Sequence, residues 1–172
     1  MALQLDHVLV AVHDLEVAIK DYRELGFTVS IRRTHRTGRT HSAVVMFSDG
    51  TYLELIAKTD FSSASDTDLS DFSSLLDGDE GLVGYALRCD DLDAETTRLR
   101  SLDFTVSDPI VSEWLQPDGT LIQYRLALID NGFTSFLIQD ITPTGNRIVS
   151  SPEYVVHDND SVGIRSVEVI VK

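Results

Sequence analysis

Apolar and polar positions in the first third of the chain predict five elements in a fixed order. A mostly apolar, β-branched run at 5–12 predicts a buried strand. Asp14 is a preferred helix N-cap residue, and the apolar residues after it have the spacing of one helix face: Leu15, Ala18, Ile19 and Tyr22. Three further runs have the pattern of strands, at about 27–35, 41–47 and 51–57. The predicted order is β-α-β-β-β.

The same order returns 77 residues later. The stretch RELGFTVS at 23–30 recurs as RSLDFTVS at 100–107, and the helix cap Asp14 recurs as Asp91. A period of this length exceeds the roughly 20–50 residues of solenoid and propeller repeats, so we interpret the chain as two copies of one module. The strands of the second copy are expected at about 82–89, 104–111, 121–129 and 134–139.

We divide the chain into four parts on this basis. They are a first module at 1–57, an acidic connector rich in Ser and Asp at 58–80, a second module at 81–140 and a C-terminal extension at 141–172 that ends in a strand. The connector also contains three apolar residues with the spacing of a short helical face: Phe72, Leu75 and Leu76. A lid over a groove is therefore an alternative to a simple connector.

The formal charge of −14 at pH 7 argues against two classes of partner. Nucleic acids and anionic membranes are themselves negatively charged and would repel this chain. No apolar run approaches the roughly 18 residues that cross a bilayer, and the amino terminus lacks the basic flank of a signal peptide. We therefore expect a cytoplasmic protein. The single cysteine, Cys89, lies in an apolar segment, which predicts a buried and unreactive thiol.

Two β-α-β-β-β units in tandem resemble the vicinal oxygen chelate superfamily. The segments LDHVLVAVHDLEVAIKDYRELGF, THSAVVMFSDGTYLELIA and GLVGYALRCDDLDAETTRLR are similar to its glyoxalase-like domain family, and the resemblance covers about residues 5–145. It implies an α+β fold in which tandem βαβββ modules form an incomplete barrel of the glyoxalase/bleomycin-resistance/dioxygenase type around a cavity. The alternatives of closure within one chain and closure between the subunits of a homodimer stay open.

The resemblance also implies a candidate metal site. In the superfamily's metal enzymes the first and last strands of each module each supply one ligand, and the matching residues of the first module are His7 and Glu54. The matching residues of the second module are Gly84 and Phe136, which cannot bind a metal. A divalent zinc, iron, manganese, cobalt or nickel ion is therefore expected only if a further ligand helps, and His41 is our candidate. The alternatives are a His41 bonded to backbone and no metal at all.

Three more residues are candidate substrate contacts beside His41. Arg39 belongs to an arginine-rich hairpin whose guanidinium groups suit a carboxylate or phosphate. Tyr124 and Arg125 fall on opposite faces of one predicted strand, so at most one of them faces the cavity. Trp114 lies near a strand end and is expected at the cavity mouth. A solvated hairpin tip and ordinary core aromatics are the alternatives.

These observations support two functions of different classes. The first is an enzyme of the lyase, isomerase or oxygenase type that acts on a small oxygenated metabolite. His7 and Glu54 are then metal ligands or, without metal, a catalytic acid–base pair. The second is a non-catalytic protein that binds or sequesters a small molecule, as antibiotic-binding members of the superfamily do. The missing second pair of ligands favours the second function.

Overall fold

The first module contains the five predicted elements. The computed structural model describes residues 3–35, 38–59, 76–116, 119–130 and 134–170, and Phe72 and Leu75 of the predicted connector lie outside these ranges. The elements of the first module are β1 (Gln4–Ala11), α1 (Leu15–Glu24), β2 (Ser30–Thr34), β3 (Thr40–Met46) and β4 (Tyr52–Lys58).

The second module repeats this order with one difference. Its elements are β5 (Gly81–Arg88), α2 (Leu92–Arg100), β6 (Thr105–Val106), β7 (Ile110–Leu115), β8 (Leu121–Asp130) and β9 (Thr134–Asp140). The single strand expected at 104–111 is therefore two strands, and both pair with β8. Pro109 lies between them and has no N–H to donate to a ladder, which explains the interruption.

The internal repeat is visible in the positions of the strands. β1 and β5 start and end 77 residues apart, at Gln4 and Gly81 and at Ala11 and Arg88. In the parallel pair of β1 and β4, Leu9 lies opposite Glu54, whereas in the parallel pair of β5 and β9, Ala86 lies opposite Phe136. Since Leu9 and Ala86 are also 77 residues apart, Phe136 is the structural counterpart of Glu54.

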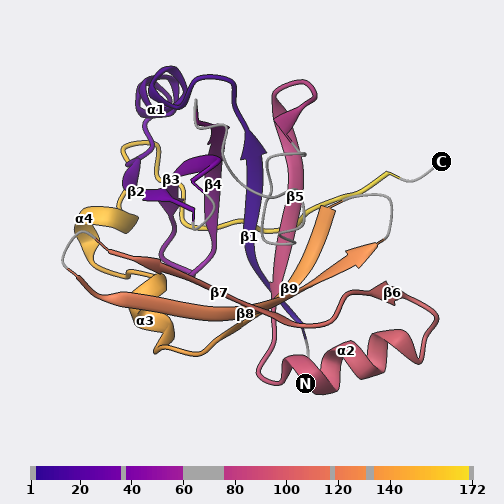
Figure 1. Ribbon diagram of the computed structural model, residues 1–172. Coiled ribbons are helices and arrows are strands. Elements are labelled where there is room, and N and C mark those ends of the chain that lie inside the picture. The colour runs from indigo at the N-terminus through magenta and orange to yellow at the C-terminus, as the bar shows by residue number, and fades with distance from the viewer. Residues whose placement is uncertain (1–2, 36–37, 60–75, 117–118, 131–133, 171–172) are drawn as a thin grey trace.

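All nine strands of the described residues belong to one curled, unclosed sheet (Figure 1). The order is β2-β3-β4-β1-β5-β9-β8-β6, with β7 also paired to β8. The two modules meet edge to edge through the antiparallel pair of β1 and β5. The predicted α+β fold of tandem βαβββ modules in an incomplete barrel is confirmed.

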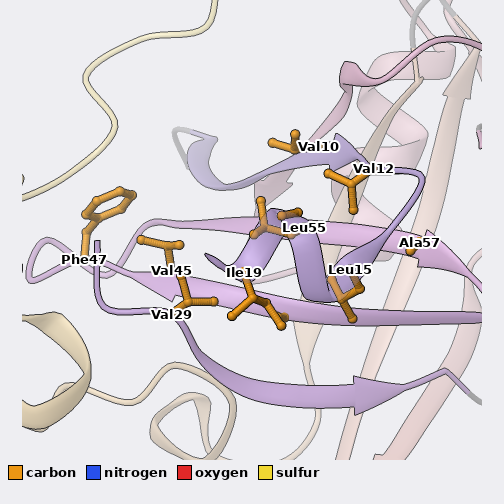
Figure 2. Close-up of a cluster of buried hydrophobic side chains, with 11 residues drawn as sticks. Val10, Val12, Leu15, Ile19, Val29, Val45, Phe47, Leu55 and Ala57 are labelled. Carbon is orange, nitrogen blue, oxygen red and sulfur yellow. The ribbon is translucent and has the colours of Figure 1, made fainter. Parts of the chain in front are cut away.

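The helices α1 and α2 each pack on the convex face of their own module. Leu15 and Ile19 of α1 pack against Val45 and Leu55 of the sheet, in the cluster drawn in Figure 2. In the second module Leu92 and Leu99 of α2 pack in the same way on Ala127 and Leu137. Burial of one such aliphatic side chain contributes about 1.5–3 kcal/mol, so these two clusters hold α1 and α2 against their modules.

The concave face of the first module is covered at both ends. Leu76, from the end of the connector, packs on Ala11, Ile56 and Val83. At the other end Ile148 and Val155 pack on Val44, Met46 and Tyr52. The part of the concave face that remains between these two covers holds His7 and Glu54.

The C-terminal segment lies against the first module. Its described part forms no strand, although the sequence predicts one. It contains two short helices, α3 (Thr144–Arg147) and α4 (Pro152–Val155), and then runs along the β3–β4 hairpin. Asp49 N–H donates to Val162 O, and Ile164 N–H donates to Thr51 Oγ1. Both edges of β3 and of β4 are already paired, so this segment has no ladder to join there. None of the described helices is long and apolar enough to span a membrane.

Candidate active site in the concave sheet

A narrow cavity lies between the two modules. Its free volume is about 30 Å³, which is room for about one or two water molecules. Residues of both modules line it, so one chain forms the cup by itself. The polar lining residues are His7, His35, Tyr52, Glu54, Tyr124 and Arg147, and the others are Leu9, Trp114, Leu126, Phe136 and Ile138.

Glu54 is the buried carboxylate of this cavity. It is 6% exposed and lies on β4, on the same face as Tyr52 and Ile56. Ser42 Oγ donates a hydrogen bond to Glu54 Oε1 at 2.7 Å, and His35 Nε2 lies 3.2 Å from the same oxygen. Two donors at Oε1 fix the carboxylate, and its other oxygen, Oε2, lies 3.6 Å from His7 Nε2.

His7 lies beside Glu54 and is held on three sides. Its Nδ1 is 2.7 Å from Asp6 Oδ1. Its ring stacks on Tyr52, with centroids 4.4 Å apart and planes at 14°, and meets the edge of Phe136 at 5.5 Å. An ionised carboxylate only accepts hydrogen bonds, so Nδ1 carries the proton and Nε2 faces Glu54. His7 and Glu54 therefore lie on one face of the sheet, as predicted.

Asp6 and Arg147 form the layer behind His7. Both side chains are buried, at 0% and 2% exposure. Burial by itself raises the pKa of Asp6, but hydrogen bonds from His7 and Arg147 outweigh it and hold that pKa well below its ordinary value. Burial likewise lowers the pKa of Arg147, and the neighbouring Tyr52, Asp6 and Asp140 raise it well above its ordinary value. Asp6 is thus ionised at neutral pH.

His35, and not His41, is the second histidine of the site. The register pairs His41 with Ala57, which places His41 on the helix side of the sheet with Ala43. His41 therefore does not lie beside His7 and Glu54, and its predicted role as a metal ligand or substrate contact has no support in this geometry. Side chains alternate between the two faces of a strand. Ser42 lies on the same face of the sheet as Glu54, so His41, the residue before it, lies on the opposite face.

The predicted contacts of the second module do line the cavity. Trp114 on β7 and Tyr124 on β8 both belong to the lining, whereas Arg125 points away and pairs with Asp93 through bonds of 2.8 and 2.7 Å. Arg39 precedes β3, accepts a hydrogen bond from Thr59 N–H at its carbonyl and is not among the lining residues of the described chain. Its predicted substrate contact has no support in this geometry.

The donor set does not fit a resident metal ion. The two superfamily positions in the second module are Gly84 and Phe136, and the register of β5 and β9 leaves no slip that would bring Gln139 into the cup. Gln139 instead donates a hydrogen bond to Asp90 O at 2.6 Å. Among the described residues, no group of three His, Cys, Asp or Glu side chains is arranged to hold a metal. His7, His35 and Glu54 share the cavity but do not form such a group, and His35 Nε2 lies in hydrogen-bond contact with Glu54 Oε1.

Cys89 lies outside this site. It is half-buried on the outer side of the second module, and burial raises the pKa of its thiol to about 11, with further upward contributions from the nearby carboxylates of Glu95, Asp90 and Asp91. Almost none of it is thiolate at neutral pH, so it does not act as a nucleophile there.

Sequence comparison identifies the family of the chain. The profile of the glyoxalase-like domain matches residues 5–172, which is nearly the whole chain. None of the curated proteins compared with the chain matches its sequence.

Several solved structures share the fold. A hypothetical protein from Staphylococcus aureus superposes with a TM-score of 0.67 at 15% identity over 90% of this chain, and the chain spans 65% of that protein's length. The methylmalonyl-CoA epimerase of Streptomyces coelicolor has a TM-score of 0.58 and 23% identity, covering 82% of this chain and 100% of its own. The methylmalonyl-CoA epimerase of Mycobacterium tuberculosis has a TM-score of 0.55 and 24% identity, and the match covers 78% of this chain and 86% of the epimerase. At these identities the similarity is one of fold.

Proposed function

Because this chain belongs to the glyoxalase-like domain family, we propose that it moves a proton on a small carbonyl compound, with Glu54 and His7 as the acid–base pair. The observation that carries this proposal is the buried pair of His7 and Glu54 in the cavity lining, with Asp6 behind His7. A carboxylate and an oriented imidazole side by side are the groups that general acid–base catalysis requires.

Each residue has a distinct part in the proposed reaction. Glu54 takes the proton from the carbon next to the carbonyl, and Ser42 and His35 keep its carboxylate oriented. His7 Nε2, which carries no proton at rest and lies 3.6 Å from Glu54 Oε2, then accepts this proton from Glu54 and returns it to the enolate oxygen or the neighbouring carbon. The apolar walls exclude water, which strengthens both interactions. No step requires a metal.

The asymmetry of the two modules narrows the reaction class. The counterpart of Glu54 is Phe136, so the opposite wall has no carboxylate at the matching position. Inversion of a carbon centre, as in the epimerases of similar fold, needs a proton to leave one face and return to the other. With one base, proton return to the same face is expected, and we propose an isomerase or lyase that transfers the proton on a single face.

The proposal is tested by proton exchange in D₂O. A panel of small 2-oxo and 2-hydroxy carbonyl compounds and short acyl-CoA thioesters is incubated with protein, and loss of the α-proton is followed by NMR. We expect exchange with retention of configuration for at least one compound, and a loss of about 10²-fold or more in Glu54→Gln. The matched control is Glu95→Gln, which removes a buried carboxylate on α2, outside the cup.

Two results would contradict the proposal. One is equal exchange by Glu54→Gln and wild type, and the other is no acceleration by wild type of any compound in the panel. The second result favours a binding protein. That candidate has its own support, because Trp114, Tyr124 and Phe136 give one wall of the cup an aromatic surface without a carboxylate or an imidazole. A drug-like cation or neutral aromatic compound that raises the Tm equally in wild type and Glu54→Gln would support it.

A further inference from the structure

We infer that Arg147 is a positioning residue for His7 and that the C-terminal segment is therefore part of the active site. The inference rests on the proposed function only in treating His7 as the reacting imidazole. Arg147 itself lies at the end of α3, 140 residues after His7, and its side chain lines the cavity.

All five N–H groups of Arg147 have acceptors. Nε donates to Asp140 Oδ1 at 2.6 Å, and Nη2 donates to Asp140 Oδ2 at 3.0 Å and to Asp6 Oδ2 at 2.9 Å. Nη1 donates to Asp6 Oδ1 at 2.8 Å and to Tyr52 Oη at 3.0 Å. A guanidinium with every donor engaged has none left for an anionic substrate, so its role is exerted through its neighbours.

The first route to His7 passes through Asp6. A carboxylate in the interior is costly unless a cation and hydrogen bonds compensate it, and Arg147 provides both. Arg88 Nη1 adds a weaker cationic contact to Asp6 at 3.7 Å. While Asp6 is ionised, it accepts the Nδ1–H of His7 and holds the imidazole in the tautomer whose Nε2 faces Glu54.

The second route passes through Tyr52. Arg147 donates to the Tyr52 hydroxyl, and the Tyr52 ring stacks flat on the His7 ring. One residue thus fixes both the tautomer and the plane of the imidazole. A supporting residue of this kind commonly changes activity by about 10- to 100-fold at metal-ligating histidines, and we expect an effect of the same size here.

The docking of α3 explains how Arg147 is held in place. Ile148, the residue after it, is buried against Val44, Met46 and Tyr52. Further along, His157 accepts the Thr28 N–H at Nδ1 and lies 2.9 Å from Met46 O through Nε2. The segment therefore contacts the first module before and after α4. These contacts hold Arg147 in its position near His7.

The test reads the tautomer of His7 directly. Protein labelled with ¹⁵N at histidine is compared by NMR at one neutral pH as wild type, Arg147→Met and Arg147→Lys. We expect the wild-type His7 signal to show Nδ1–H, and Arg147→Met to show the Nε2–H tautomer or a mixture. The lysine variant keeps the positive charge but has fewer hydrogen-bond donors. It folds if the charge is sufficient for folding, and its His7 should show a partial shift from the Nδ1–H to the Nε2–H tautomer.

The control is Arg125→Met, which removes another bidentate arginine–aspartate pair, on the outer face of the second module. It should leave the His7 signal unchanged. A folded Arg147→Met or Arg147→Lys whose His7 remains entirely Nδ1–H would overturn the inference. This readout needs no substrate, so it stands apart from the proton-exchange test. If exchange is observed, Arg147→Met should lower kcat by about 10- to 100-fold with little change in KM.

Discussion

Asp6 is the residue whose ionisation ties the stability of the cup to pH. Its pKa in the folded chain lies well below the ordinary value of 3.8, because the hydrogen bonds from His7 and Arg147 exceed the opposite effect of burial. A carboxyl with a lowered folded-state pKa contributes stability above its unfolded pKa, and this contribution is lost as the pH falls through and below that value. Acid should therefore weaken this chain from about pH 4 downward.

The variant Asp6→Asn tests this dependence. At pH 7 it leaves Arg147 buried without one of its two carboxylates, so we expect the free energy of unfolding to fall by about 3–5 kcal/mol. Below pH 4 the difference between wild type and variant should shrink, since Asp6 takes up a proton in the unfolded wild type while it stays ionised in the folded chain. Urea unfolding followed by circular dichroism from pH 3 to pH 7 measures both. A difference that stays constant over this range would show that ionised Asp6 is not the cause.

At the scale of single residues, the sequence predicted that His7 and Glu54 face one cavity and missed the residues that hold them. His7 and Glu54 stood out because each is polar within an apolar strand, and both do face the cavity. His35 and Arg147 gave no such signal, since neither stands within an apolar strand and their partners are distant in sequence. His41 lies on the helix side of the sheet, because it is one residue away from the positions of β3 that face the cavity.

The helices α1 and α2 each begin after an aspartate N-cap, but the two aspartates accept different numbers of backbone hydrogen bonds. Asp14 accepts hydrogen bonds from Glu16 N–H at 2.9 Å and Val17 N–H at 3.1 Å, whereas Asp91 accepts one from Ala94 N–H at 3.0 Å. We expect Asp14→Ala to lower the free energy of unfolding by about 1 kcal/mol and Asp91→Ala by less.

The same urea titrations at pH 7 measure the two cap variants. Asp21→Ala is the control, because Asp21 is an exposed acid in the middle of α1 and should change stability by less than about 0.5 kcal/mol. If the two cap variants were no less stable than Asp21→Ala, the caps would contribute nothing to folding.

At the scale of elements, local pattern predicted most of the fold. The helix spacing after Asp14 and the alternation of Tyr52 and Glu54 with Leu53 and Leu55 were enough to place α1 and β4. The failures occurred where an element depends on its neighbours. The C-terminal segment alternates like a strand, yet the hairpin it crosses has no unpaired edge, and Pro109 divides what reads as one strand into β6 and β7.

At the scale of the whole molecule, the two modules have the same fold but contribute different side chains to the cavity. The first module contributes His7, His35 and Glu54, and the second contributes the wall of Trp114 and Phe136. The repeat in sequence predicted this division, because it placed Gly84 and Phe136 opposite His7 and Glu54. Sequence alone could not show that both modules line one cavity within a single chain, since the same modules also pair between subunits in this superfamily.

The central claim is that this asymmetric cup performs acid–base chemistry without a resident metal. The most direct test is the metal content of wild type and Glu54→Ala, purified without chelator and measured by mass spectrometry. The account predicts zinc, iron, manganese, cobalt and nickel well below one ion per chain in both proteins. One ion per wild-type chain that disappears in Glu54→Ala would contradict it.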